Sequence, residues 1–260
     1  MIFETHAHYD DEAFDADRDE LLQSMERNGI GTIVNACASM DGLMDTVALM
    51  EKYPFVYGAI GVHPDDAERM TEETLKTIRQ LSRHEKAVAI GEIGLDYYWH
   101  KEKEEHLIQQ KMFRAQMDIA REEKLPFMIH SREAAEDTLE IVRGYMKGGM
   151  YGGIIHCFSY SKEIAREYLN MGLYLGIGGV VTFTNARKLK EVVEYAPLEQ
   201  LVLETDSPYL APVPFRGKRN SSLNLPYVAK AIAELKGTAV EEVIHITERN
   251  ARKLLLFSEK

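Results

Sequence analysis

The chain has 260 residues, a length that favours a single large domain or two small ones, and its 45% hydrophobic content can build a sizeable core, which excludes wholesale disorder. Its 42 Asp and Glu residues outnumber 31 Lys and Arg residues, which gives a formal net charge of -11. This charge argues against a protein that binds DNA through a broad cationic surface, because such binding needs clustered Lys and Arg at the phosphates. It does not exclude an enzyme that acts on nucleic acid through a small local site.

Neither the N-terminal residues nor the cysteines point to secretion. Glu4 and residues 10–12 are acidic where a signal peptide is basic and then apolar. Two cysteines, Cys37 and Cys157, cannot make a disulfide framework, which favours a reducing compartment. The longest charge-free stretch, residues 168–186, holds too many polar residues and glycines for a membrane helix. We therefore expect a soluble cytoplasmic protein with no membrane association and no obligate protein partner.

Short apolar runs alternate along the chain with longer stretches whose apolar residues lie three and four apart, as in buried strands and amphipathic helices. The apolar runs predict eight strands, at residues 1–5, 31–37, 56–61, 88–91, 126–130, 153–156, 173–178 and 201–204. The longer stretches predict a helix around Leu21, Leu22 and Met25, and further helices at residues 40–52, 72–83, 103–124, 132–146, 162–171, 185–195, 226–236 and 240–256.

This alternation predicts an α/β fold with a parallel sheet, since strands joined by crossover helices usually run in the same direction. Eight such repeats in a chain of about 250 residues are typical of a (β/α)8 TIM barrel. The alternative is a doubly wound open sheet, but no Gly-rich phosphate-binding turn follows the first strand to support it. We expect a single barrel domain over residues 1–260.

Ionisable side chains occur where the predicted strands end. They are His6 and His8 after the first strand, His63 after the third, Glu92 after the fourth, His130 after the fifth, His156 after the sixth and Asp206 after the eighth. In a parallel barrel all the carboxyl ends of the strands open onto one face, where active sites are built. We therefore expect these side chains to converge.

A structural explanation for each residue must be weighed against a role in a site. A single histidine at the end of an apolar run, such as His130 or His156, is more often a hydrogen-bonded core residue than a ligand. Glu92 and Asp206, however, are costly to bury unless something cationic compensates their charge. Because so many costly groups occupy equivalent positions, a divalent metal is the natural compensation.

Six ligands exceed what one tetrahedral zinc ion needs, so we expect two divalent metal ions, about 3.5–4 Å apart, that share a bridging carboxylate. Glu92 is the candidate bridge, with His6, His8 and Asp206 on the first metal and His130 and His156 on the second. Such a pair lowers the pKa of a shared water, and Asp206 can take its proton and return it to the leaving group. Mixed nitrogen and oxygen ligands favour Zn²⁺ or Mn²⁺ over Mg²⁺.

Six segments resemble the motifs of the TatD family of metal-dependent hydrolases. They are Glu4-Thr-His-Ala-His8, Gly61-Val-His-Pro64, Gly91-Glu-Ile-Gly-Leu-Asp96, His130-Ser-Arg132, His156-Cys-Phe-Ser159 and Glu204-Thr-Asp-Ser-Pro208, with Asn250 in a matching C-terminal helix. The resemblance spans nearly the whole chain. It implies an amidohydrolase-type (β/α)8 barrel and a dinuclear site with DNase activity, often as a 3′→5′ exonuclease. It also implies His6, His8, Glu92, His130, His156 and Asp206 as metal ligands, with His63 and Arg219 near the substrate phosphate.

Three departures from the family pattern are visible. Glu4 stands where the family usually has Asp, and since residues 4, 6 and 8 share one strand face, we expect Glu4 just below the ligands. Ser221 and Ser222 follow Gly217-Lys-Arg-Asn220, a segment that continues with Glu and Pro in the family pattern. This difference puts the substrate contacts of the loop around residues 217–222 in question. Tyr160 stands where Gly is common and is expected to narrow the mouth of the site.

The leading functional hypothesis is phosphodiester hydrolysis at single-stranded DNA ends, with Arg132, Lys218 and Arg219 as a small basic rim. A second hypothesis keeps the metals but cleaves an aminoacyl-tRNA ester, an amide or a lactone, because loops choose the substrate in barrels. A third is a metal-bound scaffold without catalysis. The sequence leaves open whether Trp99, beside Tyr97 and Tyr98, lines the pocket or packs a long loop.

Overall fold

The computed structural model describes residues 1–255, in which eight strands alternate with helices and follow one another in chain order in one eight-stranded sheet. The strand pairs whose register is defined are parallel. The predicted α/β class and the (β/α)8 TIM barrel are thereby confirmed. The chain forms two compact units, one made of Met1–Asn35 with the residues from Cys157 onward and the other of Ala36–His156. The single domain expected over residues 1–260 stays a prediction.

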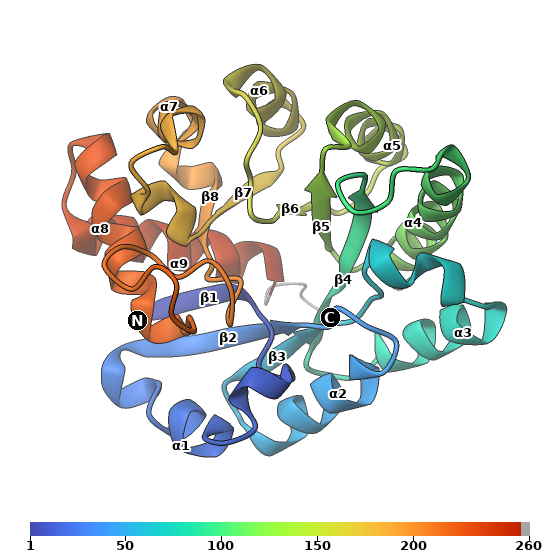
Figure 1. Ribbon diagram of the computed structural model, residues 1–260, viewed down its shortest axis with the longest axis horizontal. Coiled ribbons are helices and arrows are strands. Elements are labelled where there is room, and N and C mark those ends of the chain that lie inside the picture. Colours follow the sequence, from blue (N-terminus) through green and yellow to red (C-terminus); the bar gives the residue numbers. More distant parts are fainter. Residues whose placement is uncertain (256–260) are drawn as a thin grey trace. The chain divides into compact units, whose positions relative to one another are not determined.

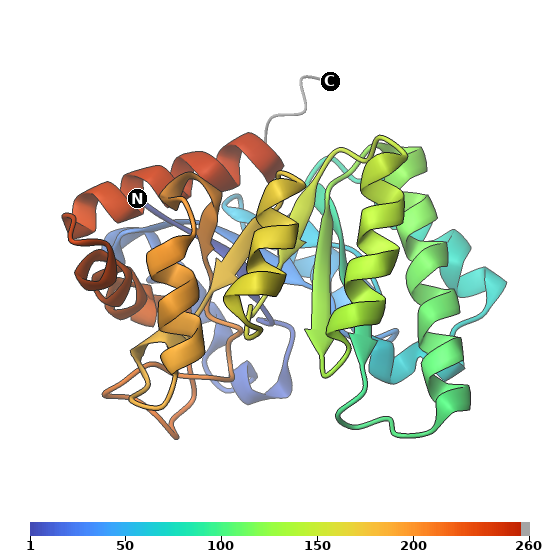
Figure 2. The same cartoon turned by 90° about the horizontal axis from the view of Figure 1, so that it is seen from above.

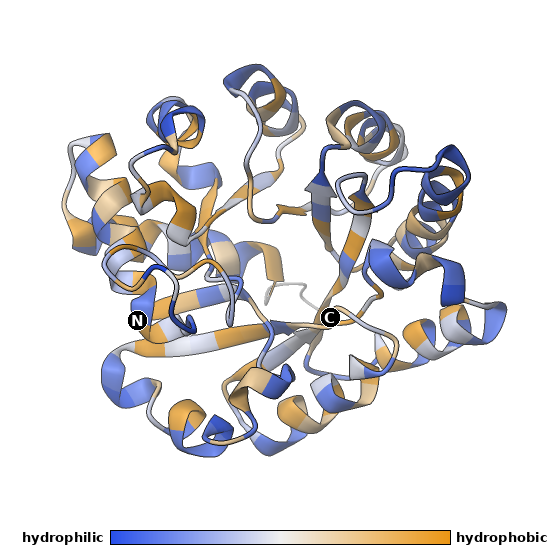
Figure 3. Ribbon diagram, in the orientation of Figure 1, coloured by the Kyte–Doolittle hydropathy of each residue, from blue (hydrophilic) through white to orange (hydrophobic). Residues whose placement is uncertain are grey.

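The strands are β1 (Ile2–Ala7), β2 (Ile30–Ala36), β3 (Val56–Ala59), β4 (Ala87–Asp96), β5 (Phe127–Arg132), β6 (Gly153–Ile155), β7 (Tyr174–Ile177) and β8 (Leu201–Leu203). The α-helices are α1 (Arg18–Gln23), α2 (Gly42–Lys52), α3 (Glu72–Leu81), α4 (Lys103–Glu123), α5 (Ala135–Lys147), α6 (Lys162–Asn170), α7 (Arg187–Tyr195), α8 (Leu225–Lys236) and α9 (Val240–Leu255). Most helices show alternating hydrophobic and hydrophilic segments, as amphipathic helices do (Figure 3).

The unit formed by Ala36–His156 contains the strands β3 to β6 and the helices α2 to α5. All ten residues of β4 are buried, as expected for a strand that is covered on both faces. Helix α4 packs along β4, and α5 lies beside α4 (Figures 1 and 2). Between the two helices, the Tyr145 hydroxyl donates to the Arg114 carbonyl at 2.9 Å. This packing holds the carboxyl ends of β4 and β5 in place.

One glycine allows β4 and β5 to approach closely next to the reactive residues. Gly94 is paired with His130 and has a φ of 147°, a conformation that side chains rarely adopt. A Cβ atom at this position would lie 1.9 Å from the His130 carbonyl oxygen. Gly94 therefore lets Glu92 and Asp96, on either side of it along β4, lie next to His130 on β5.

The other unit contains β1, β2, β7 and β8 with α1 and α6 to α9. In this unit β8 lies beside β1, where the Thr5 hydroxyl donates to the Leu203 carbonyl at 2.9 Å. The His8 amide donates to the Ser207 carbonyl at 2.8 Å, just beyond both strands. Helix α9 packs on β1 and β8 (Figure 2). The side-chain amide of Asn250 on this helix donates to the carbonyls of Leu198 and Leu201.

The predicted strands and helices are all present, with differences at their ends. Strand β4 was expected to end at residue 91 but continues to Asp96, so Glu92 lies inside the strand and not after it. Similarly, Arg132 closes β5, whereas the sequence predicts a helix beginning there. Leu256, the last residue of the final predicted helix, lies outside the described residues. Among residues 1–255, no helix combines the length and the apolar character that crossing a membrane requires.

Candidate metal centre

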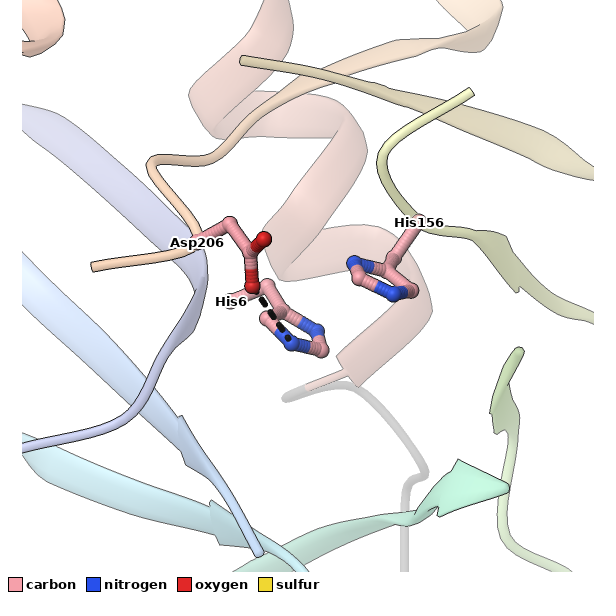
Figure 4. Close-up of side chains that lie close together, drawn as sticks. All are labelled: His6, His156 and Asp206. Atoms are coloured by element: carbon pink, nitrogen blue, oxygen red, sulfur yellow. Dashed lines mark ion pairs between the residues drawn. The ribbon is translucent and has the colours of Figure 1, made fainter. Parts of the chain in front are cut away.

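The unit made of Met1–Asn35 and the residues from Cys157 onward, called the first unit below, brings His6, His8 and Asp206 together. The Nε2 atoms of His6 and His8 are 3.1 Å apart, and Asp206 Oδ1 lies 3.2 Å from His8 Nε2 and 3.7 Å from His6 Nε2. Figure 4 shows the carboxylate of Asp206 directed at the His6 ring, with this ion pair dashed. His6 is fully buried and His8 is 7% exposed. Two imidazole nitrogens and one carboxylate oxygen therefore face a common point.

The backbone explains why these three side chains meet. Residues two apart on a strand point to the same side, so His6 at the end of β1 and His8 just beyond it present their rings together. The Asp206 amide donates to the His6 carbonyl at 3.0 Å, which anchors the segment after β8 to β1. Asp206 itself has a φ of 57°, in the left-handed region that few residues other than glycine, asparagine and aspartate adopt.

The unit formed by Ala36–His156, called the second unit below, brings Glu92, His130 and His156 together. Glu92 Oε1 lies 2.7 Å from His156 Nε2 and 2.8 Å from His130 Nδ1, and the two imidazole nitrogens are 3.3 Å apart. The Glu92 side chain is 3% exposed. The backbone amide of Glu92 donates to the Cys37 carbonyl at 2.9 Å. One buried carboxylate oxygen therefore faces two imidazoles.

Asp96 fixes the far side of the His130 ring. Its Oδ2 atom lies 3.2 Å from His130 Nε2, which leaves Nδ1 on the side of Glu92 and His156. Burial lowers the pKa of His130, but hydrogen bonds to Asp96 and Glu92 outweigh it and raise the pKa to about 9. A carboxylate behind an imidazole is the usual way in which a metal-binding histidine is oriented. The surroundings of His130 therefore favour positive charge.

His63 lies next to this second group. Its Nε2 atom is 3.8 Å from Glu92 Oε1, and its ring centroid is 4.3 Å from that of His130. On its other side, His63 Nδ1 accepts a hydrogen bond from the Asp65 amide at 3.2 Å. Ligand atoms of His63, Glu92 and His130 lie within 4.8 Å of one another. The role at the substrate phosphate that the family resemblance implies for His63 stays a prediction.

The donor chemistry of both groups fits a divalent cation. Each group combines imidazole nitrogens with a largely buried carboxylate, a donor set that suits Zn²⁺ or Mn²⁺. The apolar strands around them would make such carboxylates costly without a positive partner. The chain thus has His, Glu and Asp clusters that can bind metal.

Glu4 and Ser222, both departures from the family pattern, contact each other. Glu4 is fully buried below the first group, and its Oε1 accepts hydrogen bonds from the amides of His6 (3.1 Å) and Thr205 (2.9 Å). Its Oε2 accepts from the hydroxyls of Thr205 (2.7 Å) and Ser222 (2.9 Å). Tyr9 completes the network, since its hydroxyl lies 2.8 Å from the Ser222 hydroxyl. Ser222 is therefore a buried partner of Glu4.

Replacing Glu4 with glutamine is expected to make the stability of the metal-free protein less dependent on pH. Burial raises the pKa of the Glu4 carboxyl from 4.5 to about 7, against the opposing effect of its hydrogen bonds. The stability contributed by the proton is fully present below the unfolded pKa and is lost as the pH rises through the folded pKa. From about pH 5 to about pH 8, this carboxyl should lower the free energy of unfolding by about 2 kcal/mol.

Urea unfolding of the wild-type protein and Glu4→Gln, both metal-free, at the two pH values measures this difference. Glu163→Gln, which changes an exposed carboxylate on α6, is the matched control and should keep the wild-type pH dependence. If the free energy of unfolding fell equally between the two pH values in Glu4→Gln and in the wild-type protein, the pH dependence could not be assigned to Glu4.

Arg219 is engaged within the first unit. Its guanidinium donates to both carboxylate oxygens of Asp17, at 2.7 and 2.6 Å, and to the Ala13 carbonyl at 2.7 Å. Its guanidinium carbon also lies 4.9 Å from the centroid of the Phe14 ring. The contact with a substrate phosphate that the family resemblance implies for Arg219 stays a prediction, and such a contact would compete with Asp17.

Three comparisons with known proteins show what the chain is similar to. The family described as TatD related DNase matches residues 3–256. The uncharacterised metal-dependent hydrolase YabD of Bacillus subtilis is 46% identical over 254 residues, covering 98% of each chain. A protein of a Rahnella species named 3'-5' ssDNA/RNA exonuclease TatD is 29% identical over 265 residues, covering 100% of each. The crystal structure of YjjV, a TatD homologue from Escherichia coli, superposes with a TM-score of 0.91 at 28% identity over 98% of each chain.

The barrel fold and the His, Glu and Asp clusters define a metal-dependent hydrolase. The chain belongs to the TatD family.

Proposed function

We propose that this hydrolase is a divalent-metal-dependent phosphodiesterase, a DNase that removes nucleotides from the 3′ ends of single-stranded DNA. The observation that most supports it is the pair of carboxylate–imidazole groups, one around Asp206 and one around Glu92, both in the carboxyl-terminal halves of barrel strands or just beyond them. Active sites of barrels of this class are built at the carboxyl ends of the strands.

In this proposal His6, His8 and Asp206 hold one metal ion, and Glu92, His130 and His156 hold a second. When bound, divalent metals polarise a phosphoryl oxygen and make water a better nucleophile near neutral pH. The sequence-based prediction that Glu92 bridges both ions stays a prediction. Asp96 and Glu4 do not bind metal in this proposal: Asp96 orients the His130 ring, and Glu4 fixes the backbone at His6.

Asp206 is the proposed proton carrier. Its side chain is 17% exposed, so it can reach both a buried ligand and an incoming substrate, whereas the Glu92 side chain is 3% exposed. An ionised carboxylate at this position can accept a proton from the attacking water and return it to the departing oxygen. Glu92 acts in this proposal as the carboxylate ligand whose charge compensates the second metal ion beside His130 and His156.

Two observations favour phosphodiester bonds over other bonds. The Rahnella relative, similar over the full length of both chains, is named as an exonuclease of single-stranded DNA and RNA. The net charge of -11 also disfavours a long basic groove and suits an enzyme that holds only a strand end. On this proposal the partner of the protein is a nucleic-acid end.

The test is digestion of one single-stranded oligonucleotide, labelled at either its 3′ or its 5′ end, by metal-loaded protein. The proposal expects the 3′ label to appear at once as a mononucleotide, while the 5′ label moves through a ladder of shortening products. Parallel assays with a carboxyl ester, an amide and a lactone cover the alternative chemistries. Turnover of one of these with intact oligonucleotide would overturn the phosphodiesterase proposal, and no turnover of any substrate would favour a scaffold.

A further inference from the structure

Two aromatic side chains are exposed in the turn that follows β4. Trp99 is 65% exposed and Tyr98 is 38% exposed, and their ring centroids lie 4.7 Å apart with the planes nearly perpendicular. Neither ring is needed to fill the core. Adjacent aromatic rings left in contact with water are a common mark of a binding surface.

Cationic groups lie against the same rings. The Arg132 guanidinium carbon is 3.9 Å from the centroid of Tyr98 and 5.6 Å from that of Trp99. The Lys101 ammonium lies 5.1 Å from the Tyr98 centroid and 3.7 Å from Glu133 Oε2. A guanidinium stacked on an aromatic ring keeps its N–H groups available at the edge for a phosphate. The surface therefore complements a ligand with a flat apolar face and negative charge.

Asp96 ties this surface to the candidate metal centre. Its Oδ1 accepts hydrogen bonds from the amides of Tyr98 (2.8 Å) and Trp99 (3.1 Å), while its Oδ2 contacts His130 Nε2 at 3.2 Å. Arg132 is likewise only two residues beyond His130 on β5. One carboxylate thus fixes both the aromatic turn and a proposed metal ligand.

We propose that Tyr98, Trp99 and Arg132 form a platform that binds an unpaired nucleobase, with the base stacked on Trp99 and Arg132 at a phosphate of the same strand. This inference rests on the proposed nuclease function and names how the strand is held. Because every base has a π face, such a platform accepts all four bases. It requires an unpaired base, since a base in a duplex is already stacked on its neighbours.

Binding can be read from Trp99 directly, because it is the chain's only tryptophan. Asp206→Asn protein, used to prevent digestion, is titrated with an oligothymidylate and with an oligomer of the same length whose residues are abasic. The platform expects the oligothymidylate to quench the tryptophan fluorescence and the abasic oligomer to leave it nearly unchanged. Equal quenching by both, no quenching by either, or a fluorescence change that depends only on protein concentration would overturn it.

Kinetics on the active protein provide the second readout. Trp99→Ala is expected to lower kcat/KM on the oligothymidylate about 10- to 100-fold, because stacking on an aromatic ring contributes that much to binding each base. Trp99→Phe should retain most of the activity, and hydrolysis of the abasic oligomer should be unchanged in both variants. Tyr151→Ala, which removes an exposed aromatic ring just before β6, is the matched control and should behave as wild type.

The outcomes separate this inference from the proposed function. If the oligothymidylate quenches Trp99 fluorescence in a base-dependent way but metal-loaded wild-type protein does not hydrolyse it, the nuclease function is contradicted and the platform is supported. Oligonucleotide hydrolysis that Trp99→Ala leaves unchanged would sink the platform and support the nuclease function. An equal loss on base-bearing and abasic oligomers in Trp99→Ala would show a structural role for Trp99 and would also contradict the platform.

Discussion

Replacing Asp206 with asparagine is expected to lower the rate of oligonucleotide hydrolysis at least about 1,000-fold while the protein stays folded. The carboxylate lies 3.2 Å from His8 Nε2 and 3.7 Å from His6 Nε2, and no other carboxylate is assigned to that metal in the proposal. An amide keeps the shape of the side chain but cannot take up a proton from water and has a neutral oxygen. The substitution thus removes proton transfer and weakens a ligand in one step.

The matched control is Asp118→Asn, which makes the same change at a partly exposed residue of α4 whose carboxylate contacts Arg121 and Tyr145. It should hydrolyse the oligonucleotide at the wild-type rate. Circular dichroism and the unfolding midpoint would show that both variants are folded. Equal nuclease activity in Asp206→Asn and wild-type preparations would point to a contaminating nuclease and would refute the assignment of Asp206.

Removing divalent metal is expected to abolish hydrolysis, and Glu92→Gln is expected to weaken metal binding by more than about 100-fold. Glu92 Oε1 lies within 2.8 Å of nitrogens on both His130 and His156, so its charge is what compensates a cation there. Glutamine places a neutral amide against the same nitrogens, which leaves a cation among imidazoles without its carboxylate. Metal content by elemental analysis after dialysis, together with the hydrolysis rate, measures both effects.

Glu140→Gln is the control for this substitution, because Glu140 is an exposed carboxylate on α5 of the same unit. Its metal content and rate should match those of the wild-type protein. Adding Mn²⁺ or Zn²⁺ back to chelator-treated wild-type protein should restore hydrolysis, whereas Glu92→Gln should need far higher metal concentrations. A chelator-treated wild-type protein that hydrolyses at full rate would show that metal has no part in the reaction.

The order of the strands and helices could be predicted because each repeat changes its hydrophobic period where the element changes. Two of the errors lie where a charged residue, Glu92 or Arg132, stands inside a strand. Glu92 interrupts an apolar run, so polarity alone predicts that the strand ends at residue 91, yet β4 continues to Asp96. Backbone pairing with β5 continues past the carboxylate because Gly94 lets the two strands approach each other.

The candidate ligands could be predicted because they lie where the apolar runs of the predicted strands end, but their partners could not. Asp96 was visible only as a member of a motif, although it lies four residues after Glu92 and so on the same face of the strand. The contact of Ser222 with Glu4 joins residues that are 218 positions apart, and no local pattern predicts such a pair. Similarly, no sequence pattern reveals that Asp17 forms an ion pair with the guanidinium of Arg219.

The acidity of the chain is compatible with an enzyme of nucleic-acid ends when charge is considered locally. In the second unit the neighbouring carboxylates of Asp96 and Glu92 raise the pKa of His130 to about 9, so the acidic groups of this site are what favour cations there. Metal ions and Arg132, not a broad basic surface, would then attract the phosphate. Such an enzyme should bind long DNA weakly, and its rate of hydrolysis should depend little on the length of the strand.

The most direct test of a metal-dependent phosphodiesterase is a titration of metal-free protein with Mn²⁺ while the release of 3′-terminal nucleotides and the bound metal are both measured. We predict that release is absent without metal, rises with the metal occupancy of the wild-type protein, and stays at least about 1,000-fold lower in Asp206→Asn at every metal concentration. Release that is independent of occupancy, or a fully loaded wild-type protein that leaves the oligonucleotide intact, would contradict the account.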